Sequence, residues 1–330
     1  MMAYSNVQEV VNIMEKVSVV IPAYKAENTI IKAVKSALQQ GGCVKEVIVV
    51  IDGVFDKTCD ALKSIEDARL NVIIFHQNKG AQIARNKGLS LASSEYIIFL
   101  DSDDYFEGGF IIGLLATLVK TDANFCIGKN CRVYSDGKKS YFNVNDNFNN
   151  IDVLKGWILG TCAVGPTCIL WQKNIINSIG GWDEKVVRNQ DGDLVIRAIV
   201  NGAEPCFSKI GAGCTVQHDG HRISRLRTKE SFMEQSGIYQ SVSTYLEVFK
   251  GDTNTRKQIK AALNYFCINI CIGMAQSGFK GDNYVVWKNR IDWKISHFFQ
   301  LPKSKSLLAL IFFVFGRNAF IVKKILKKLS

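Results

Sequence analysis

Three carboxylates directly follow an apolar run in the segment YIIFLDSDDY, from Tyr96 to Tyr105. Asp101, Asp103 and Asp104 are near enough in sequence to repel one another and raise one another's pKa unless a positive group lies among them. An Asp-x-Asp spacing at the end of a strand suits Mg²⁺ or Mn²⁺, which prefer oxygen ligands and often bind substrate phosphates as well. The plainer alternative is a solvated acidic turn or a helix cap. The strand and the polar loops expected beside the cluster favour a metal site.

An alternation of strands and helices is expected to position this cluster. Helices are expected after Asn28, at 58–65 and at 81–91, between apolar strands at 17–21, 46–51, 71–75 and 96–100. This order predicts an α/β fold with a mostly parallel, doubly wound sheet, in which ligands bind at the carboxyl ends of the strands. Pro22-Ala23-Tyr24, Asp52, Asn78 and Asp101 all follow strands, so they should converge on one rim.

The remainder of the chain has a mixed pattern and then a helical one. A helix is expected at 110–119, a strand at 124–127, an exposed loop at 143–150 and a helix at 194–200. Beyond residue 226, helices are expected at 231–248, 255–274 and 306–329. We therefore expect one domain over 1–225, with a nucleotide-binding part at 16–104 and an acceptor part at 105–225, followed by a helical region at 226–330.

Charge is concentrated at the carboxyl-terminal end. The chain has a formal charge of +11, and residues 301–330 contribute +7 of it without any acidic residue. Ile321, Ile325 and Leu329 lie near one helical face between lysine pairs, which is typical of a helix in the headgroup region of an anionic membrane. The alternative is a terminal helix packed on a neighbour or a second subunit. No nucleic-acid motif accompanies the charge.

Other segments bear on where the protein acts. The N-terminus lacks the basic start and apolar stretch of a signal peptide, and no apolar run reaches the length of a spanning helix. The ten cysteines are scattered without a CxxC pair, which favours reduced thiols in a cytosolic protein. We therefore expect a cytoplasmic protein, peripherally associated with the inner face of the cell membrane.

Four segments resemble one known family, in the expected order. VVIPAYKAENTI, EVIVVIDGVFDKT, NKGAQIARNKGLSLASSEYIIFLDSDD and GGWDE…QDGDLVIRA are similar to the family-2 glycosyltransferases with a GT-A fold, over about residues 16–225. The resemblance implies inverting transfer of a sugar from a nucleotide-diphosphate donor, a UDP-sugar in particular, with help from Mn²⁺ or Mg²⁺. The implied acceptor is a glycan or a lipid-linked molecule, as in surface polysaccharide synthesis.

The resemblance also implies roles on the donor side. In Asp101-Ser102-Asp103, Asp103 would coordinate the metal that bridges the diphosphate, and Asp101 would contact the ribose or a metal-bound water. The base would lie over the loop Pro22-Ala23-Tyr24, accompanied by Glu27, and Asp52 would accept a hydrogen bond from it. Ile51 stands where the family commonly has another aspartate, so the identity of the nucleotide base is open.

The N-x-G…A-R-N segment of the family is matched by Asn78, Gly80, Arg85 and Asn86. Gly80 would let the backbone approach the sugar-nucleotide donor, and Arg85 could neutralise the charge of a phosphate or a carboxylate. An ordinary salt bridge from Arg85 to the acidic strand end is the alternative, and both can hold together.

Acceptor-side roles follow from the later segments. Asp191 would be the general base that deprotonates the acceptor, although Gln190 replaces the usual glutamate before it. Trp182 would form a wall for the acceptor sugar or be a core residue, and Asp193 would line the acceptor side or interact with a helix dipole. His218 would contact the metal or be structural.

Two rival functions remain at this point. One is a phosphohydrolase with Asp101 as nucleophile and Asp103 as acid/base, but the small residue pair that usually follows such a motif is missing from DSDDYF. The other is a non-catalytic protein that binds a sugar nucleotide, which Gln190 favours.

Overall fold

The computed structural model describes residues 15–53, 57–142, 145–161, 164–186, 189–217, 228–279, 281–292, 301 and 305. His218 and the basic segment 306–329 lie outside these residues. The chain forms two compact units. Unit 1 contains Met1–Asn150, Ala163–Glu184 and Asn201–Gly220, and unit 2 contains Ile151–Cys162, Lys185–Val200 and His221–Ser330. The expected division at residue 225 stays a prediction.

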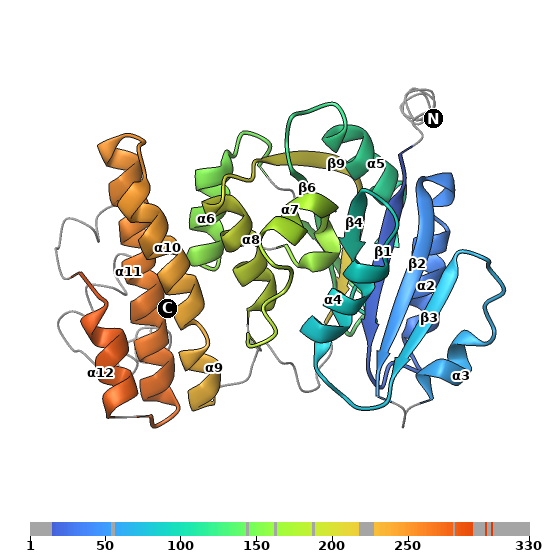
Figure 1. Ribbon diagram of the computed structural model, residues 1–330, viewed down its shortest axis with the longest axis horizontal. Helices are drawn as coiled ribbons and strands as arrows, with labels where there is room; N and C mark the ends of the chain where they lie inside the picture. The colour runs from blue at the N-terminus through green and yellow to red at the C-terminus, as the bar shows by residue number, and fades with distance from the viewer. Residues whose placement is uncertain are drawn as a thin grey trace. The chain divides into compact units, whose positions relative to one another are not determined.

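The described part of unit 1 is built around one nine-stranded sheet, in the order β3-β2-β1-β4-β8-β6-β9-β5, with β7 beside β6 (Figure 1). The strands are β1 (Val17–Ala23), β2 (Val44–Asp52), β3 (Leu70–Phe75), β4 (Tyr96–Phe99), β5 (Tyr105–Glu107), β6 (Phe125–Val133), β7 (Lys139–Phe142), β8 (Ile169–Gln172) and β9 (Pro205–Val216). Strands β1 to β4 pair in parallel with one another, as expected. The other half is mixed, because β8 runs antiparallel to β4 and β6 whereas β9 runs parallel to β6.

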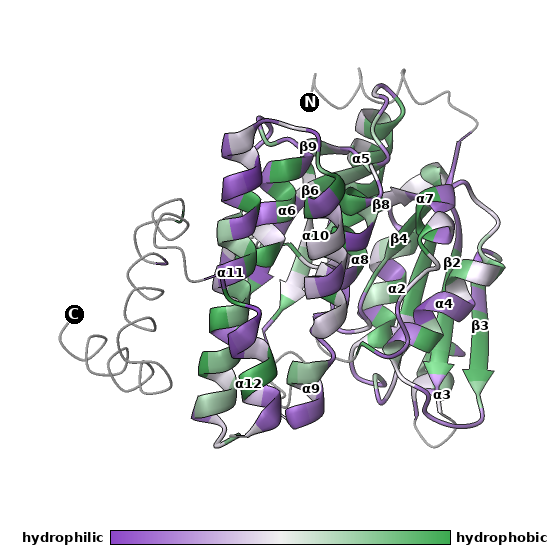
Figure 2. Ribbon diagram, turned by 60° about the vertical axis from the view of Figure 1, so that its left-hand side comes forward, coloured by the Kyte–Doolittle hydropathy of each residue, from purple (hydrophilic) through white to green (hydrophobic). Residues whose placement is uncertain are grey.

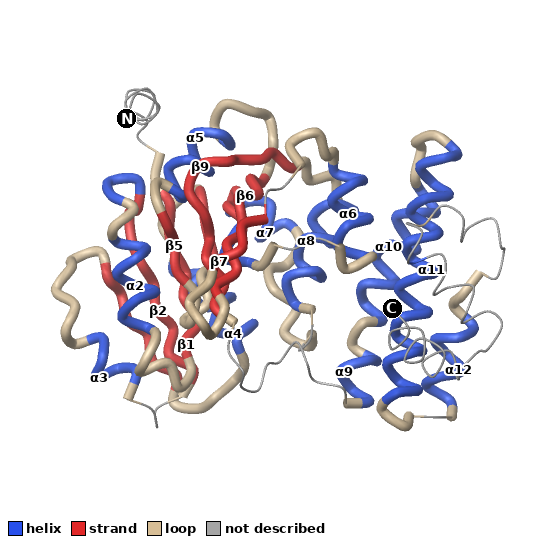
Figure 3. The backbone as a smooth tube through the Cα atoms, turned by 180° about the vertical axis from the view of Figure 1, so that it is seen from behind, coloured by secondary structure: helices blue, strands red, loops and turns tan. Residues whose placement is uncertain are grey.

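Complete burial explains the apolar composition of the central strands. Every residue of β1 and β4 is buried, which is typical of parallel strands covered on both faces. Helices α2 (Ile30–Leu38) and α4 (Ala81–Leu91) lie on opposite faces of the sheet (Figures 1 and 3). The edge strand β3 is apolar in Figure 2, and its Val72 and Ile74 are exposed.

Close contact between α4 and the sheet depends on Gly88. A Cβ atom added to Gly88 would lie 2.3 Å from Cγ1 of Val20 in β1, so a larger residue would push the helix away. The remaining helices of unit 1 are α3 (Thr58–Leu62), α5 (Phe110–Leu118), α7 (Lys173–Ser178) and the 3₁₀ helices η1 (Gly41–Cys43) and η2 (Pro166–Cys168). Gly88 therefore fixes the helix that supplies the polar side chains described below.

Unit 2 is helical in its described part. It contains α8 (Gln190–Val200), α9 (Lys229–Met233), α10 (Ser236–Val248), α11 (Thr253–Gln276), α12 (Asp282–Asn289) and most of α6 (Asn150–Ile158). Helix α10 packs against both α8 and α11. The helix expected at 231–248 is divided into α9 and α10, and the one expected at 194–200 begins earlier, at Gln190. None of the described helices is long and apolar enough to span a membrane.

Candidate functional site

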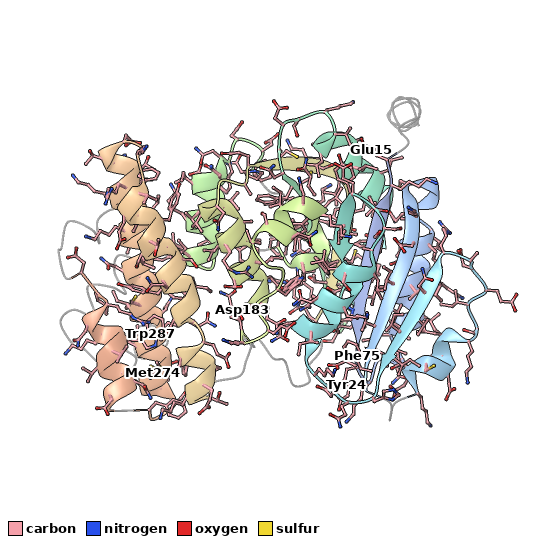
Figure 4. The ribbon with its side chains drawn as sticks, viewed as in Figure 1. Glu15, Tyr24, Phe75, Asp183, Met274 and Trp287 are labelled. Atoms are coloured by element: carbon pink, nitrogen blue, oxygen red, sulfur yellow. The ribbon has the colours of Figure 1, made fainter. Side chains whose placement is uncertain are left out.

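Loops that follow β1, β2 and β3 meet at the carboxyl ends of the strands. A Cβ atom on Gly53, after β2, would lie 3.6 Å from Cε2 of Tyr24 and 3.7 Å from the backbone N of Asn78. Gly53 has φ +128°, a conformation that favours glycine. Figure 4 shows Tyr24 and Phe75 at the same end of the sheet. The structure thus brings together the loops after β1, β2 and β3, three of the four strand ends expected to converge, and Asp101 follows β4, which is parallel to β1.

The carboxylate of Asp52 holds two of these loops together. Asp52 is 3% exposed; its Oδ1 accepts a hydrogen bond from the backbone N of Lys79 at 2.7 Å, and its Oδ2 accepts one from the N of Gly80 at 2.8 Å. Gly80 has φ +102° and precedes α4. Asp52 therefore fixes the turn between Asn78 and α4, while its predicted contact with a nucleotide base stays a prediction.

A positive partner for the acidic cluster comes from α4. Nη2 of Arg85 lies 2.7 Å from Oδ1 of Asp101, and the Arg85 side chain is 7% exposed compared with 34% for Asp101. The guanidinium carbon also lies 4.5 Å from the centre of the Trp182 ring. The salt-bridge alternative for Arg85 is therefore present in the structure, and a phosphate contact stays a prediction.

Asp104 is the buried member of the cluster and has structural partners. Its Oδ2 accepts a hydrogen bond from the Thr167 hydroxyl at 2.9 Å, and its Oδ1 accepts one from the backbone N of Val216 at 2.9 Å. Burial, and then the charges of Asp101 and Asp103, raise the pKa of Asp104 well above its usual value. Asp104 precedes strand β5, so the helix-cap alternative is wrong. Its role is to fasten the strand end to β9 and η2.

The donor set of the cluster fits a hard divalent cation. One oxygen from each of Asp101, Asp103 and Asp104 lies within 4.8 Å of the others. Asp104 is committed to its two hydrogen-bond donors, so Asp101 and Asp103, both partly exposed, are the residues that would hold Mg²⁺ or Mn²⁺.

A second group of ligand-type side chains, Glu107, Cys131 and Cys214, suits such a cation less well. Glu107 forms an ion pair with Lys139, and the two thiols lie in a buried cluster with Val133 and Ala212. Thiols are soft ligands, which Mg²⁺ and Mn²⁺ do not prefer. The aspartate cluster is therefore the better candidate.

Other predicted donor-side residues lie on the same loops. Pro22 and Ala23 end β1 in the buried core, Tyr24 is 48% exposed, and Asn78 is exposed. Oε2 of Glu27 is buried and has no hydrogen-bond partner among the described residues. It could therefore accept a hydrogen bond from a bound ligand. Ser102 lies partly exposed between Asp101 and Asp103.

Trp182 is a core residue of unit 1. It is 2% exposed, and its ring meets the Phe99 ring edge to face with 5.0 Å between the centroids. The core alternative for Trp182 therefore agrees with the structure, and contact with an acceptor sugar stays a prediction. The side chain of Asn86 binds the Trp182 backbone, a contact that the match of Asn86 to the N-x-G…A-R-N segment does not predict.

Asp191 and Asp193 belong to unit 2. Both lie in the first turn of α8, so Asp191 is helical and not in the preceding loop. Oδ2 of Asp193 accepts hydrogen bonds from Nε of Arg197 at 2.8 Å and from Nη2 at 2.6 Å, and Asp193 is buried. That pair gives Asp193 a structural partner, whereas Asp191 as general base stays a prediction.

Comparison with known proteins gives a family match over part of the chain. The model of "Glycosyl transferase family 2" matches residues 18–176. These residues are similar to the family 2 glycosyltransferases. The match covers β1 to β8 and the acidic cluster, and it favours the glycosyltransferase interpretation over the phosphohydrolase alternative.

Curated relatives align with part of this chain. It is 44% identical over 93 residues to the UDP-Glc:alpha-D-GlcNAc-diphosphoundecaprenol beta-1,3-glucosyltransferase WfaP of Escherichia coli, covering 28% of this chain and 37% of WfaP. It is 32% identical over 152 residues to the putative teichuronic acid biosynthesis glycosyltransferase TuaG of Bacillus subtilis (strain 168), covering 45% of this chain and 60% of TuaG. The chain thus spans less than two thirds of each relative.

A solved structure matches nearly the whole chain. S. aureus TarS 1-349 in complex with UDP-GlcNAc superimposes with a TM-score of 0.65 at 17% identity, covering 92% of this chain and 89% of that one. The expected GT-A-like α/β fold with a helical C-terminal region is therefore confirmed.

Proposed function

We propose that this protein is an inverting glycosyltransferase that moves a sugar from a nucleotide-diphosphate donor, a UDP-sugar, to a glycan or lipid-linked acceptor in polysaccharide synthesis. The observation that carries the proposal is the acidic cluster of Asp101, Asp103 and Asp104, which follows β4 at the sheet edge where the parallel strands β1 to β4 end, within the residues that match the family 2 model. The UDP-GlcNAc complex of TarS supports a UDP-sugar as the donor.

Each group of residues has a distinct task in this reaction. The rim residues Tyr24, Glu27 and Asn78 would bind the nucleotide, and Asp101 and Asp103 would hold Mn²⁺ or Mg²⁺. When bound, the cation stabilises the charge that develops on the departing diphosphate. Asp191 would take the proton of the acceptor hydroxyl, which a single inverting displacement requires. Arg85 keeps one oxygen of Asp101 neutralised, so the empty cluster carries less uncompensated charge.

A donor panel tests the proposal. Thermal unfolding of the full chain is measured with UDP-, GDP- and dTDP-sugars, each with and without Mn²⁺. We expect a metal-dependent stabilisation with a UDP-sugar, because a ligand that binds only the native state raises its stability. Asp103→Asn should abolish the metal-dependent part. No stabilisation by any nucleotide with Mn²⁺ would refute the proposal.

A non-catalytic protein that binds a sugar nucleotide is the second candidate, because Gln190 occupies the position of the usual acid. Asp191→Asn distinguishes the two. The enzyme interpretation predicts loss of sugar transfer with the thermal response to UDP and Mn²⁺ retained. Equal transfer by Asp191→Asn and the wild type would exclude Asp191 as the base.

We also infer that the protein acts at the inner face of the cell membrane, through the basic residues of segment 306–329. The support is the charge of the segment, which carries Lys323, Lys324, Lys327 and Lys328 and no acid. Co-sedimentation with anionic and neutral vesicles tests this. Binding to anionic vesicles should be lost when the four lysines are replaced by alanine, and equal binding to both vesicle types would contradict an electrostatic attachment.

A further inference from the structure

Asn86 of α4 forms a closed pair of hydrogen bonds with the backbone of Trp182. Its Nδ2 donates to the carbonyl oxygen of Trp182 at 2.9 Å, and its Oδ1 accepts from the N–H of Trp182 at 2.9 Å. Nδ2 also donates to Oε1 of Glu184 at 3.1 Å. The two residues are 96 positions apart, so this side chain fastens a distant turn to α4.

The turn itself is shaped for this contact. Gly181 has φ +74°, and a Cβ atom at that position would lie 2.7 Å from Oδ1 of Asn86. A side chain at 181 would therefore displace the amide as well as strain the backbone. The Gly181–Trp182 backbone can approach α4 only because residue 181 is glycine.

The Trp182 ring transmits this restraint towards the acidic cluster. It contacts the Phe99 ring, with 5.0 Å between the ring centroids, and the Arg85 guanidinium carbon, which lies 4.5 Å from its ring centroid. Arg85 in turn lies 2.7 Å from Oδ1 of Asp101. A guanidinium stacked on an aromatic face has fewer orientations available, so the ring helps to fix the Arg85–Asp101 pair.

We propose that Asn86 is a positioning residue for the metal–diphosphate site. By holding the Trp182 backbone it keeps the ring against Arg85, and Arg85 keeps the Asp101 carboxylate in one orientation beside Asp103. This inference rests on the proposed function, since it assigns the cation to Asp101 and Asp103. It is independent of which sugar is transferred.

The direction of the effect follows from these contacts. Without the clamp, the Trp182 turn and the Arg85 guanidinium gain freedom, so Asp101 must be ordered again when the cation binds. Groups that orient metal ligands typically contribute 10- to 100-fold to metal affinity. Asn86 acts through two intervening side chains, so we expect the lower end, an increase of about tenfold in the Mn²⁺ concentration needed for half-maximal effect.

The chain offers a matched control in unit 2. Asn264 is buried, whereas Asn86 is partly exposed, and Asn264 forms a closed pair with the backbone of Asp292, donating through Nδ2 at 2.9 Å and accepting through Oδ1 at 3.0 Å. Asn264→Ala removes the same kind of backbone pair as Asn86→Ala, without the additional bond to Glu184, in a unit that contains none of Arg85, Asp101 and Asp103. It reports the stability cost of losing such a clamp.

The experiment is a Mn²⁺ titration of the full-length protein at fixed UDP, followed by thermal unfolding and by calorimetry. Both variants should lose stability in the absence of ligand. Asn86→Ala should need about ten times more Mn²⁺, and Asn264→Ala should match the wild type. A wild-type Mn²⁺ dependence in Asn86→Ala would overturn the inference while leaving the proposed function intact. Absence of any Mn²⁺–UDP response in the wild type would refute the proposed function, and the inference with it.

Trp182→Phe gives a second, independent reading. It keeps the backbone pair with Asn86 and reduces the aromatic face against Arg85, so it should raise the Mn²⁺ requirement in the same direction. If Asn86→Ala does not fold, this variant decides the question. A Trp182→Phe protein with the Mn²⁺ dependence of the wild type would overturn the proposed transmission through the ring.

Discussion

Replacing Asp52 with asparagine should loosen the turn at Lys79–Gly80, whether or not a nucleotide is bound. The carboxylate is buried, and each of its oxygens accepts one backbone N–H, at 2.7 and 2.8 Å. Asparagine has a single acceptor oxygen, and its amide NH₂ would face the remaining N–H donor. One hydrogen bond is therefore lost, and the other is changed from a charge-assisted to a neutral one.

The size of the effect can be worked out from these contacts. A hydrogen bond to a charged group contributes about 1.5–3 kcal/mol, and a neutral one about 0.5–1.5 kcal/mol. Losing one charge-assisted hydrogen bond of Asp52 and changing the other to a neutral one together cost about 3 kcal/mol. Lys79 is exposed, so water can reach part of the turn, and we expect a fall of about 2 kcal/mol in the free energy of unfolding.

Urea unfolding of the full chain measures this, and a fall of about 2 kcal/mol corresponds to a midpoint lower by about 0.7–1 M. Asp136→Asn is the control, because Asp136 accepts a backbone N–H from Lys138 at 3.0 Å in an exposed turn and should change stability by less than about 0.5 kcal/mol. An unchanged midpoint for Asp52→Asn, with weaker UDP binding, would refute the structural role and support the contact with the base.

Three further predictions concern unit 1. Asp104→Ala leaves the Thr167 hydroxyl without its acceptor and should lower the free energy of unfolding by about 1–3 kcal/mol, whereas an unchanged urea midpoint would show that the site does not depend on this contact. Gly88→Ala places a methyl group 2.3 Å from Cγ1 of Val20 and should cost about 1–3 kcal/mol despite the better helix propensity of alanine; a more stable variant in the same assay would contradict the packing described for α4. Burial raises the pKa of the Cys43 thiol to about 11 from 9.0, so the native state keeps a proton that the unfolded state loses. The resulting stability is complete below about pH 9 and is lost as the pH rises towards 11, so the difference in melting temperature between the wild type and Cys43→Ala should shrink over that range; a constant difference would refute the shift.

Much of the first half of the fold could be predicted because its signals are local. Strands β1 and β4 are buried throughout, so their sequences are apolar without interruption, and α4 begins and ends where its pattern predicts. Arg85 lies one turn into α4 and 16 residues before Asp101, close enough for the sequence to suggest the ion pair that is present. The strand order and the family resemblance then predict that the polar residues after these strands lie at one edge of the sheet.

Other features of the fold depend on contacts between residues far apart in the sequence, which no local sequence pattern predicts. Asp104 is held by Thr167 and Val216, which follow it by 63 and 112 residues. Strand β6 continues to Val133 instead of ending at 127, because Gly128 packs against the Phe110 ring and Cys131 pairs with β9. Asp191 is helical although Gly192 is a poor helix former, and α8 is stabilised by the Asp193–Arg197 pair one turn later.

Each unit is made of segments that are far apart in the sequence, and this affects folding during translation. Strand β9 pairs with β6, and Phe125 is opposite Pro205, so the sheet stays incomplete until residues far downstream have left the ribosome. Between these strands lies α8, whose buried face packs against α10, at 236–248. A fragment that stops at residue 225 would lack α10, would expose the part of α8 that α10 covers, and would be prone to aggregate. Truncation studies should keep the chain through α11, because each unit is built from segments that are not contiguous in the sequence and α10 packs against α11.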